Sequence, residues 1–139
     1  INKTIIDFEK YLLMYIKSIN DLNKSSNAII KSNSRICYQI NREINRSIFI
    51  LVSCIENRYL FLEKVSEIPG DVAQIIITSE SLWINIFKGN YMLSQIAWRS
   101  IVDQKYINPD VRNLIFAIGY HIDGDNRSKE LKIRPYYQI

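Results

Sequence analysis

The N-terminal part of the chain carries apolar residues at the three- and four-residue spacing of an amphipathic helix. The positions are Ile5, Phe8, Leu12, Tyr15, Ile19 and Leu22. Residues 4–7 resemble a capping box, in which side chains bond the free backbone N–H groups of a helix start. The polar run 23–27 ends the pattern. We therefore expect the first helix between these two signals.

The longest apolar pattern lies between residues 30 and 67. Its apolar positions fit a helical register: Cys37, Ile40, Ile44, Ile48, Leu51, Ile55, Leu62 and Val65. Residues 47–55 are apolar on nearly all sides, which is typical of a helix covered at the centre of a bundle. The pattern predicts one long central helix, Ile30 to Glu67. The pattern does not decide whether this helix is continuous or broken, because no residue fixes its length.

Turn signals divide the remaining chain into short segments. Residues 68–70 end the long pattern, and residues 74–78 fit either a short buried strand or a helix. Helices are predicted from Ser79 or Ser81 to Gly89, from Asn90 through Val102, and over 108–122. The inward face of the second of these consists of Leu93, Ile96, Ala97, Ile101 and Val102. Residues 126–139 form either a short strand or a docked tail.

Together these segments predict a single domain over residues 1–139, mainly α, in which five to six helices form a compact bundle around the long central helix. A short C-terminal strand or docked tail completes this fold, and an α+β fold is the alternative. The chain has 27 Ile, 13 Asn, 10 Leu and 4 Ala, a bias typical of an AT-rich genome. Ile-rich stretches are therefore weak evidence for strands here. No apolar run approaches the roughly 20 residues of a membrane-spanning helix, so no membrane insertion is expected.

The two cysteines, Cys37 and Cys54, both fall on the predicted central helix. At about 1.5 Å of rise per residue they would lie about 25 Å apart, beyond the roughly 7 Å reach of a disulfide. The sequence therefore predicts two buried thiols, which favours a reduced intracellular compartment.

Catalytic chemistry has one candidate centre. His121 is the only histidine, and it lies close to Asp123 and Asp125. A zinc site needs three or four ligands, and no second histidine or cysteine pair is spaced to complete one. Phosphate-binding and nucleophile-elbow motifs are missing from the sequence. A helix C-terminus, where an imidazolium meets the helix dipole favourably, explains His121 more simply. We predict no catalytic residue, no metal ligand and no cofactor. The sequence thus favours a non-enzymatic protein over an enzyme.

Two sets of residues are candidates for binding. Lys31, Arg35, Arg42 and Arg46 share one face of the predicted central helix, in a chain of net charge +4. Such a stripe would contact phosphates or an acidic protein surface, although a plain solvated face is the simpler explanation. Trp98 and Tyr106 belong to a group of aromatic residues of the kind that anchor protein interfaces.

These observations predict a non-enzymatic protein–protein interaction module: a helical adaptor, inhibitor, immunity or regulatory protein. Its partner would be another protein, an acidic one fitting the basic stripe, or a second copy of the chain. Nucleic-acid binding through the stripe is the first alternative. A nuclease or toxin domain without a sequence motif, centred on His121, is the second.

Overall fold

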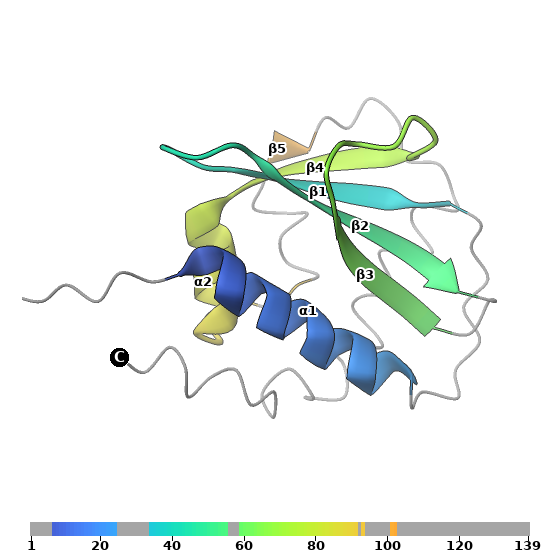
Figure 1. The fold of residues 1–139 in the computed structure, drawn as a ribbon, viewed down its shortest axis with the longest axis horizontal. Helices are drawn as coiled ribbons and strands as arrows, with labels where there is room; N and C mark the ends of the chain where they lie inside the picture. The colour runs from blue at the N-terminus through green and yellow to red at the C-terminus, as the bar shows by residue number, and fades with distance from the viewer. Residues whose placement is uncertain (1–6, 25–33, 56–58, 92, 94–100, 103–139) are drawn as a thin grey trace, which may run out of the picture.

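The computed structural model describes residues 7–24, 34–55, 59–91, 93 and 101–102. In this part of the chain two helices pack on a four-stranded mixed sheet, which a two-residue strand extends at one edge (Figure 1). The predicted mainly α, all-helical bundle of five to six helices is therefore wrong. The protein has an α+β fold, which the sequence pattern had left only as an alternative.

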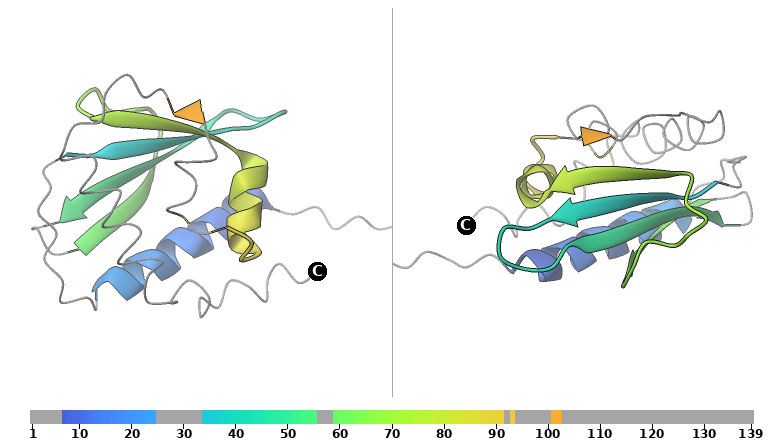
Figure 2. Two further views of the ribbon diagram at one scale, coloured as in Figure 1. Left: turned by 180° about the vertical axis from the view of Figure 1, so that it is seen from behind. Right: turned by 90° about the horizontal axis from the view of Figure 1, so that it is seen from above.

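The elements follow one another as a helix, three strands, a fourth strand, a second helix and the short strand. Their bounds are α1 Phe8–Lys24, β1 Ile36–Asn41, β2 Ile48–Ile55, β3 Tyr59–Val65, β4 Gln74–Ser79, α2 Glu80–Phe87 and β5 Ile101–Val102. Across the sheet the order is β3-β2-β1-β4-β5. β1 pairs antiparallel with β2 and parallel with β4, and the two outer pairs are antiparallel. Both helices lie on the same side of the sheet, as the two views from front and back show (Figures 1 and 2).

The predicted central helix is wrong, because β1, β2 and β3 account for most of its residues that the structure describes, 34–55 and 59–67. In β2 the side chains of Ile48, Ile50 and Val52 are buried towards the helices, whereas Leu51 is buried although it points to the other face. Apolar residues at nearly every position satisfy a helical and a strand period equally well. The apolar pattern of this segment therefore does not distinguish a helix from a strand. The abundance of Ile is typical of an AT-rich genome, yet these β-branched residues do form strands here, as in β2 and β4.

Two of the predicted helices are confirmed over the residues that the structure describes, as α1 and α2. In α1 the expected positions Phe8, Leu12, Tyr15 and Ile19 are buried. In α2 the hydroxyl of Ser79 accepts a hydrogen bond from the Leu82 N–H at 3.3 Å and caps the first turn. Gly89 follows the last turn with a φ of 80°, a conformation that glycine adopts without strain.

The ambiguous residues 74–78 belong to β4, in which buried and half-buried residues alternate. The helix expected from Asn90 through Val102 is wrong at its end, because Ile101 and Val102 pair with Ile77 and Ile76 as β5. Residues 108–122 and 126–139, for which a helix and a strand or tail were predicted, lie outside the described residues. Neither α1 nor α2, the helices of the described part, has the length and apolar content that crossing a membrane requires.

Trp83 of α2 occupies the centre of the core between the helices and the sheet. Its ring meets those of Tyr15 and Tyr38 edge-on, with centroids 6.3 and 5.5 Å away. Its Nε1 donates to the Thr78 hydroxyl at 2.8 Å, and that hydroxyl donates to the Gln39 carbonyl of β1 at 2.8 Å. A buried indole N–H needs such a partner, so this bond fixes the orientation of α2 against β4.

Asn20 of α1 joins the helix to the outer strand β3. Its Nδ2 donates to the Leu62 carbonyl at 2.8 Å, and its Oδ1 accepts from the Leu62 N–H at 2.9 Å. The amide thus pairs with the strand as a peptide group of a further strand would. Because β3 is at the edge of the sheet formed by the described strands, these two bonds satisfy buried backbone groups that no other described strand reaches.

Replacing Asn20 should destabilise the protein strongly. Asn20→Ala leaves the Leu62 N–H and carbonyl buried without partners, so we expect the free energy of unfolding to fall by about 2–4 kcal/mol. Urea denaturation measures this loss. The control is Asn85→Ala, which removes exposed hydrogen bonds to Ser81 and Asn90 and should cost about 1 kcal/mol or less. Equal losses in the two variants would contradict the proposed role of Asn20.

Candidate functional site

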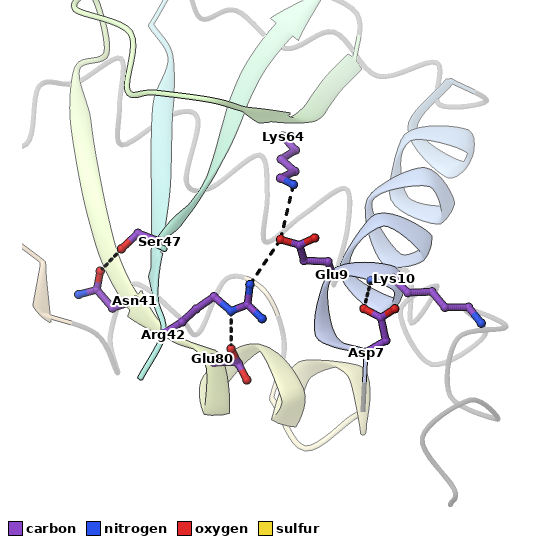
Figure 3. A network of polar contacts seen from close by, with 8 residues as sticks. All are labelled: Asp7, Glu9, Lys10, Asn41, Arg42, Ser47, Lys64 and Glu80. Carbon is purple, nitrogen blue, oxygen red and sulfur yellow. Dashed lines mark hydrogen bonds and ion pairs between the residues drawn. The ribbon is translucent and has the colours of Figure 1, made fainter. Parts of the chain in front are cut away.

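The loop between β1 and β2, residues 42–47, lies beside the first turns of both helices (Figure 3). The parallel register of β1 and β4 places it there. Asn41 and Ser79, the last residues of the two strands, are partners in that register. The next residues, Arg42 and Glu80, therefore emerge side by side at the same end of the sheet. We call residues 42–47 the hairpin loop.

Arg42 joins the hairpin loop to both helices. Its Nε donates to Glu80 Oε2 at 2.8 Å, and its Nη1 lies 3.4 Å from Glu9 Oε1. The guanidinium also lies over the ring of Phe8, 5.6 Å from the centroid. Only 12% of the Arg42 side chain is exposed, so its charge depends on these partners. Both acids lie in the first turn of a helix, where a negative charge is itself favourable.

Side-chain hydrogen bonds close the base of the hairpin loop. Asn41 Oδ1 accepts from the Ser47 hydroxyl at 3.0 Å and from Gln39 Nε2 at 2.8 Å. Figure 3 shows Asn41 and Ser47 bridging the two strands while Arg42 extends towards the helices. The loop is thus braced at its base and along one side.

Two hollows flank the hairpin loop, and Arg42 lines both. The α2 hollow, of about 350 Å³, lies between the loop and residues 79–81 and 84 of β4 and α2. The β3 hollow, of about 370 Å³, lies between the loop, Glu9 of α1 and residues 64–66. At the tip of the loop, on the wall of the α2 hollow, Ile44 is 93% exposed. The other large apolar side chain exposed in the described residues is Leu13, on α1.

The structure separates the residues predicted to form a basic stripe. Arg35 precedes β1 and pairs with Asp71, and this hydrogen bond lowers the pKa of the Asp71 carboxyl. Arg42 follows β1, so a six-residue strand of about 3.3 Å per residue lies between the two arginines. Arg46 is exposed in the hairpin loop. These three residues do not share a helix face, and Lys31, Trp98 and Tyr106 lie outside the described residues.

The cysteines lie on neighbouring strands rather than on one helix, so the predicted separation of about 25 Å has no basis. Cys37 is fully buried in β1 and Cys54 is half-buried in β2, and the two thiols form no disulfide. Burial raises the pKa of Cys37 to about 11, although a hydrogen bond with the backbone of Ile50 acts in the opposite direction. The low-pKa thiolate typical of a nucleophile is therefore not available at Cys37.

His121, Asp123 and Asp125, the candidate catalytic centre, lie outside the described residues. Over the ranges that the structure describes, no three His, Cys, Asp or Glu side chains gather closely enough to hold a metal ion. The prediction of no catalytic residue and no cofactor thus stays a prediction.

No protein-family model, no curated protein and no solved structure matches the chain.

The sequence pattern missed Glu9, Lys64 and Glu80, because ion pairs between distant segments leave no local signal. It also placed Ile44 in an inward helical stripe, whereas the residue is at the tip of a loop. One signal was present: the polar residues 41–43 and 45–47 surround Ile44 between two apolar runs, as in a β-hairpin.

Removing the Arg42 charge should destabilise the fold. Arg42→Gln leaves Glu80 and Glu9 without their shared cation and removes the contact with Phe8, so we expect the free energy of unfolding to fall by about 2 kcal/mol. Part of the pair energy is screened, because both carboxylates are partly exposed. Arg46→Gln, a matched change in the same loop, should stay within about 0.5 kcal/mol of the wild type in urea denaturation. Similar losses would contradict the structural role of Arg42.

The Cys37 thiol should make stability depend on pH in the alkaline range. Its folded-state pKa of about 11 lies above the ordinary value of 9.0, so folding favours the protonated form. The contribution is complete below pH 9 and is lost as the pH rises towards 11. Urea denaturation at pH 8, 9, 10 and 11 should show the wild type losing more stability than Cys37→Ala. Identical profiles in the two proteins would contradict the assignment.

Proposed function

We propose that the protein is a non-enzymatic interaction module that binds another protein through the hairpin loop, with Ile44 as the central apolar contact. The observation that carries the proposal is the 93% exposure of Ile44 on a loop that is braced at its base and along one side. A single exposed apolar residue is ordinary on a protein surface. Ile44 is unusual because the loop presenting it is held to α2 by the short Arg42–Glu80 ion pair and closed at its base by the bond between Asn41 and Ser47.

Rigidity of the loop favours binding. A loop that is ordered before association loses less conformational entropy when the partner arrives, so more of the contact energy appears as affinity. Arg42, Asn41 and Ser47 supply this order in the free protein. Polar and charged residues, Glu43, Asn45 and Arg46, surround Ile44 in the sequence of the loop. An apolar centre with a polar rim is the usual composition of a protein interface.

The topology of the sheet also supports binding at this place. From the carboxyl ends of β1 and β4 the chain leaves in different directions, through the hairpin loop towards β2 and through α2. In open sheets, the crevice outside the carboxyl ends of parallel strands, where the connections diverge, is a frequent binding position. The α2 hollow lies at this position, with Ile44 on one wall and Ile84 on the other. An apolar side chain of a partner fits such a hollow.

An adaptor, an inhibitor, an immunity protein and a regulatory protein all act through such a surface, so the proposal is made for this class as a whole. Binding of nucleic acid along the four-residue basic stripe has less support. Two of its cations, Arg35 and Arg42, are paired with carboxylates, and they lie at opposite ends of β1. No observation on the described residues favours this alternative specifically.

Substitution of Ile44 should abolish capture of the partner without unfolding the protein. The immobilised full chain is incubated with lysate of its native source, with and without nuclease, and the bound proteins are compared by mass spectrometry. We expect Ile44→Asp to lose at least tenfold of a specific captured protein, because a charge replaces the central apolar contact. Circular dichroism should show an unchanged fold, since Ile44 is exposed.

The matched control is Leu13→Asp, which changes the other exposed apolar residue, 48% exposed on α1. It should retain the captured protein. Equal capture by the wild type and Ile44→Asp, or capture that nuclease treatment removes, would contradict the proposal.

A further inference from the structure

The β3 hollow carries an excess of positive charge. Three cations line it, Arg42, Arg46 and Lys64, together with one carboxylate, that of Glu9. Arg42 also bonds Glu80, outside this hollow. Arg46 is exposed and forms no ion pair with any residue of the described ranges. The hollow thus offers a carboxylate more hydrogen-bond donors than the Glu9 side chain contacts.

Glu9 is a loosely bound occupant of this hollow. Its Oε1 lies 3.4 Å from Arg42 Nη1 and 3.7 Å from Lys64 Nζ, longer than the roughly 2.8 Å of a strong charge-assisted bond. Its side chain is 48% exposed. Figure 3 shows the carboxylate between the two cations, whereas Lys10 of the same helix turn points away. Since the single short bond of Arg42 is the one with Glu80, the contacts of Glu9 can be exchanged without dissolving the hairpin loop.

We infer that the β3 hollow is a subsite for a carboxylate side chain of the protein partner, in which Glu9 acts as an internal competitor. This inference rests on the proposed function, because it names the chemistry of the same partner. Asn45 lines both hollows, so the two subsites are adjacent. A partner segment with an apolar residue at Ile44 and an Asp or Glu close to it in sequence fits both. In the complex, its carboxylate accepts hydrogen bonds from Arg46 and Lys64, and Glu9 turns out to solvent.

The charges around the hairpin loop favour a single carboxylate of a protein segment over a nucleic acid. Glu9, Glu43 and Glu80 all lie within or beside the two hollows. They repel a continuous phosphate backbone, whose binding requires several uncompensated cations. One carboxylate needs only the few donors that this hollow offers.

The test uses the full chain and three probes: a capped triglutamate peptide, a capped triglutamine peptide and a short oligothymidylate. Each is titrated into the ¹⁵N-labelled protein, and the backbone amide shifts of residues 45–48 and 64–66 are followed by NMR. We expect saturable shifts there with triglutamate only. Shifts with the oligothymidylate but not with triglutamate would overturn the inference in favour of a phosphate ligand. Shifts spread evenly over all surface cations, or none at all, would overturn it as well.

Substitution of Glu9 distinguishes a competitor from a merely structural residue. Glu9→Gln keeps the shape of the side chain and removes its charge, so the Kd for triglutamate should fall about threefold to fivefold. Arg46→Gln should raise the Kd by a similar factor. The control Asp7→Asn removes the same charge from the start of α1, outside the hollow, and keeps a side chain able to accept from the Lys10 N–H. It should leave the Kd within twofold of the wild type.

A thermal melt of each variant confirms that it is folded, and Lys64→Gln supplies a second weakening variant. An unchanged or weaker affinity of folded Glu9→Gln would overturn the inference. If Ile44→Asp still abolishes capture of the native partner in that case, the proposed function stands and only the carboxylate subsite fails. If triglutamate binds tightly in the hollow but Ile44→Asp does not change capture, the carboxylate subsite stands and the proposed function fails.

Discussion

The parallel register of β1 and β4 is the constraint on which the rest of this structure depends. Because Asn41 and Ser79 are partners, the hairpin loop and α2 start from the same end of the sheet. The shortest ion pair of Arg42, with Glu80, is a direct consequence. A shift of one residue in this register would turn β4 over and expose Gln74, Ile76 and Thr78 while burying their neighbours. The buried face of β4 therefore fixes the geometry of the hairpin loop some distance away.

The helices are fixed to this sheet by two buried polar contacts rather than by apolar packing alone. Trp83 orients α2 through the hydroxyl of Thr78, and Asn20 orients α1 through the backbone of Leu62. Apolar contacts tolerate small shifts, whereas hydrogen bonds to buried donors do not. The aromatic contacts from Trp83 through Tyr15 and Phe87 to Phe8 then continue to the guanidinium of Arg42. The position of Glu9 beside the hairpin loop follows from how α1 is seated on β3.

The parts of the fold that the sequence predicts are those with local signals. Helix α1 has a one-sided apolar stripe, and α2 has a serine cap and a terminal glycine, so both are correctly expected. β1 to β3 were assigned to a helix because β2 is apolar on both of its faces, which removes the two-residue alternation. Of the candidate site, the sequence singled out Arg42 and Arg46 as binding residues but none of the residues that surround them in space. The contacts of this site join residues 33, 38 and 55 positions apart, and only the strand register brings them together.

The net charge of +4 is a poor guide to the partner, because the basic residues of the chain differ in exposure and in whether a carboxylate is paired with them. Arg35 and Arg42 are each engaged by a carboxylate, and Arg42 is nearly buried, so neither contributes a free positive charge at the surface. Arg46 in the hairpin loop is exposed without such a partner among the described residues. Of the three arginines that the sequence placed on one stripe, the most available is therefore Arg46, which shares the hairpin loop with Ile44. In the function proposed above, recognition depends on one apolar contact and one charged contact close together, which is enough to select a short segment of a partner and too little to hold a polyanion.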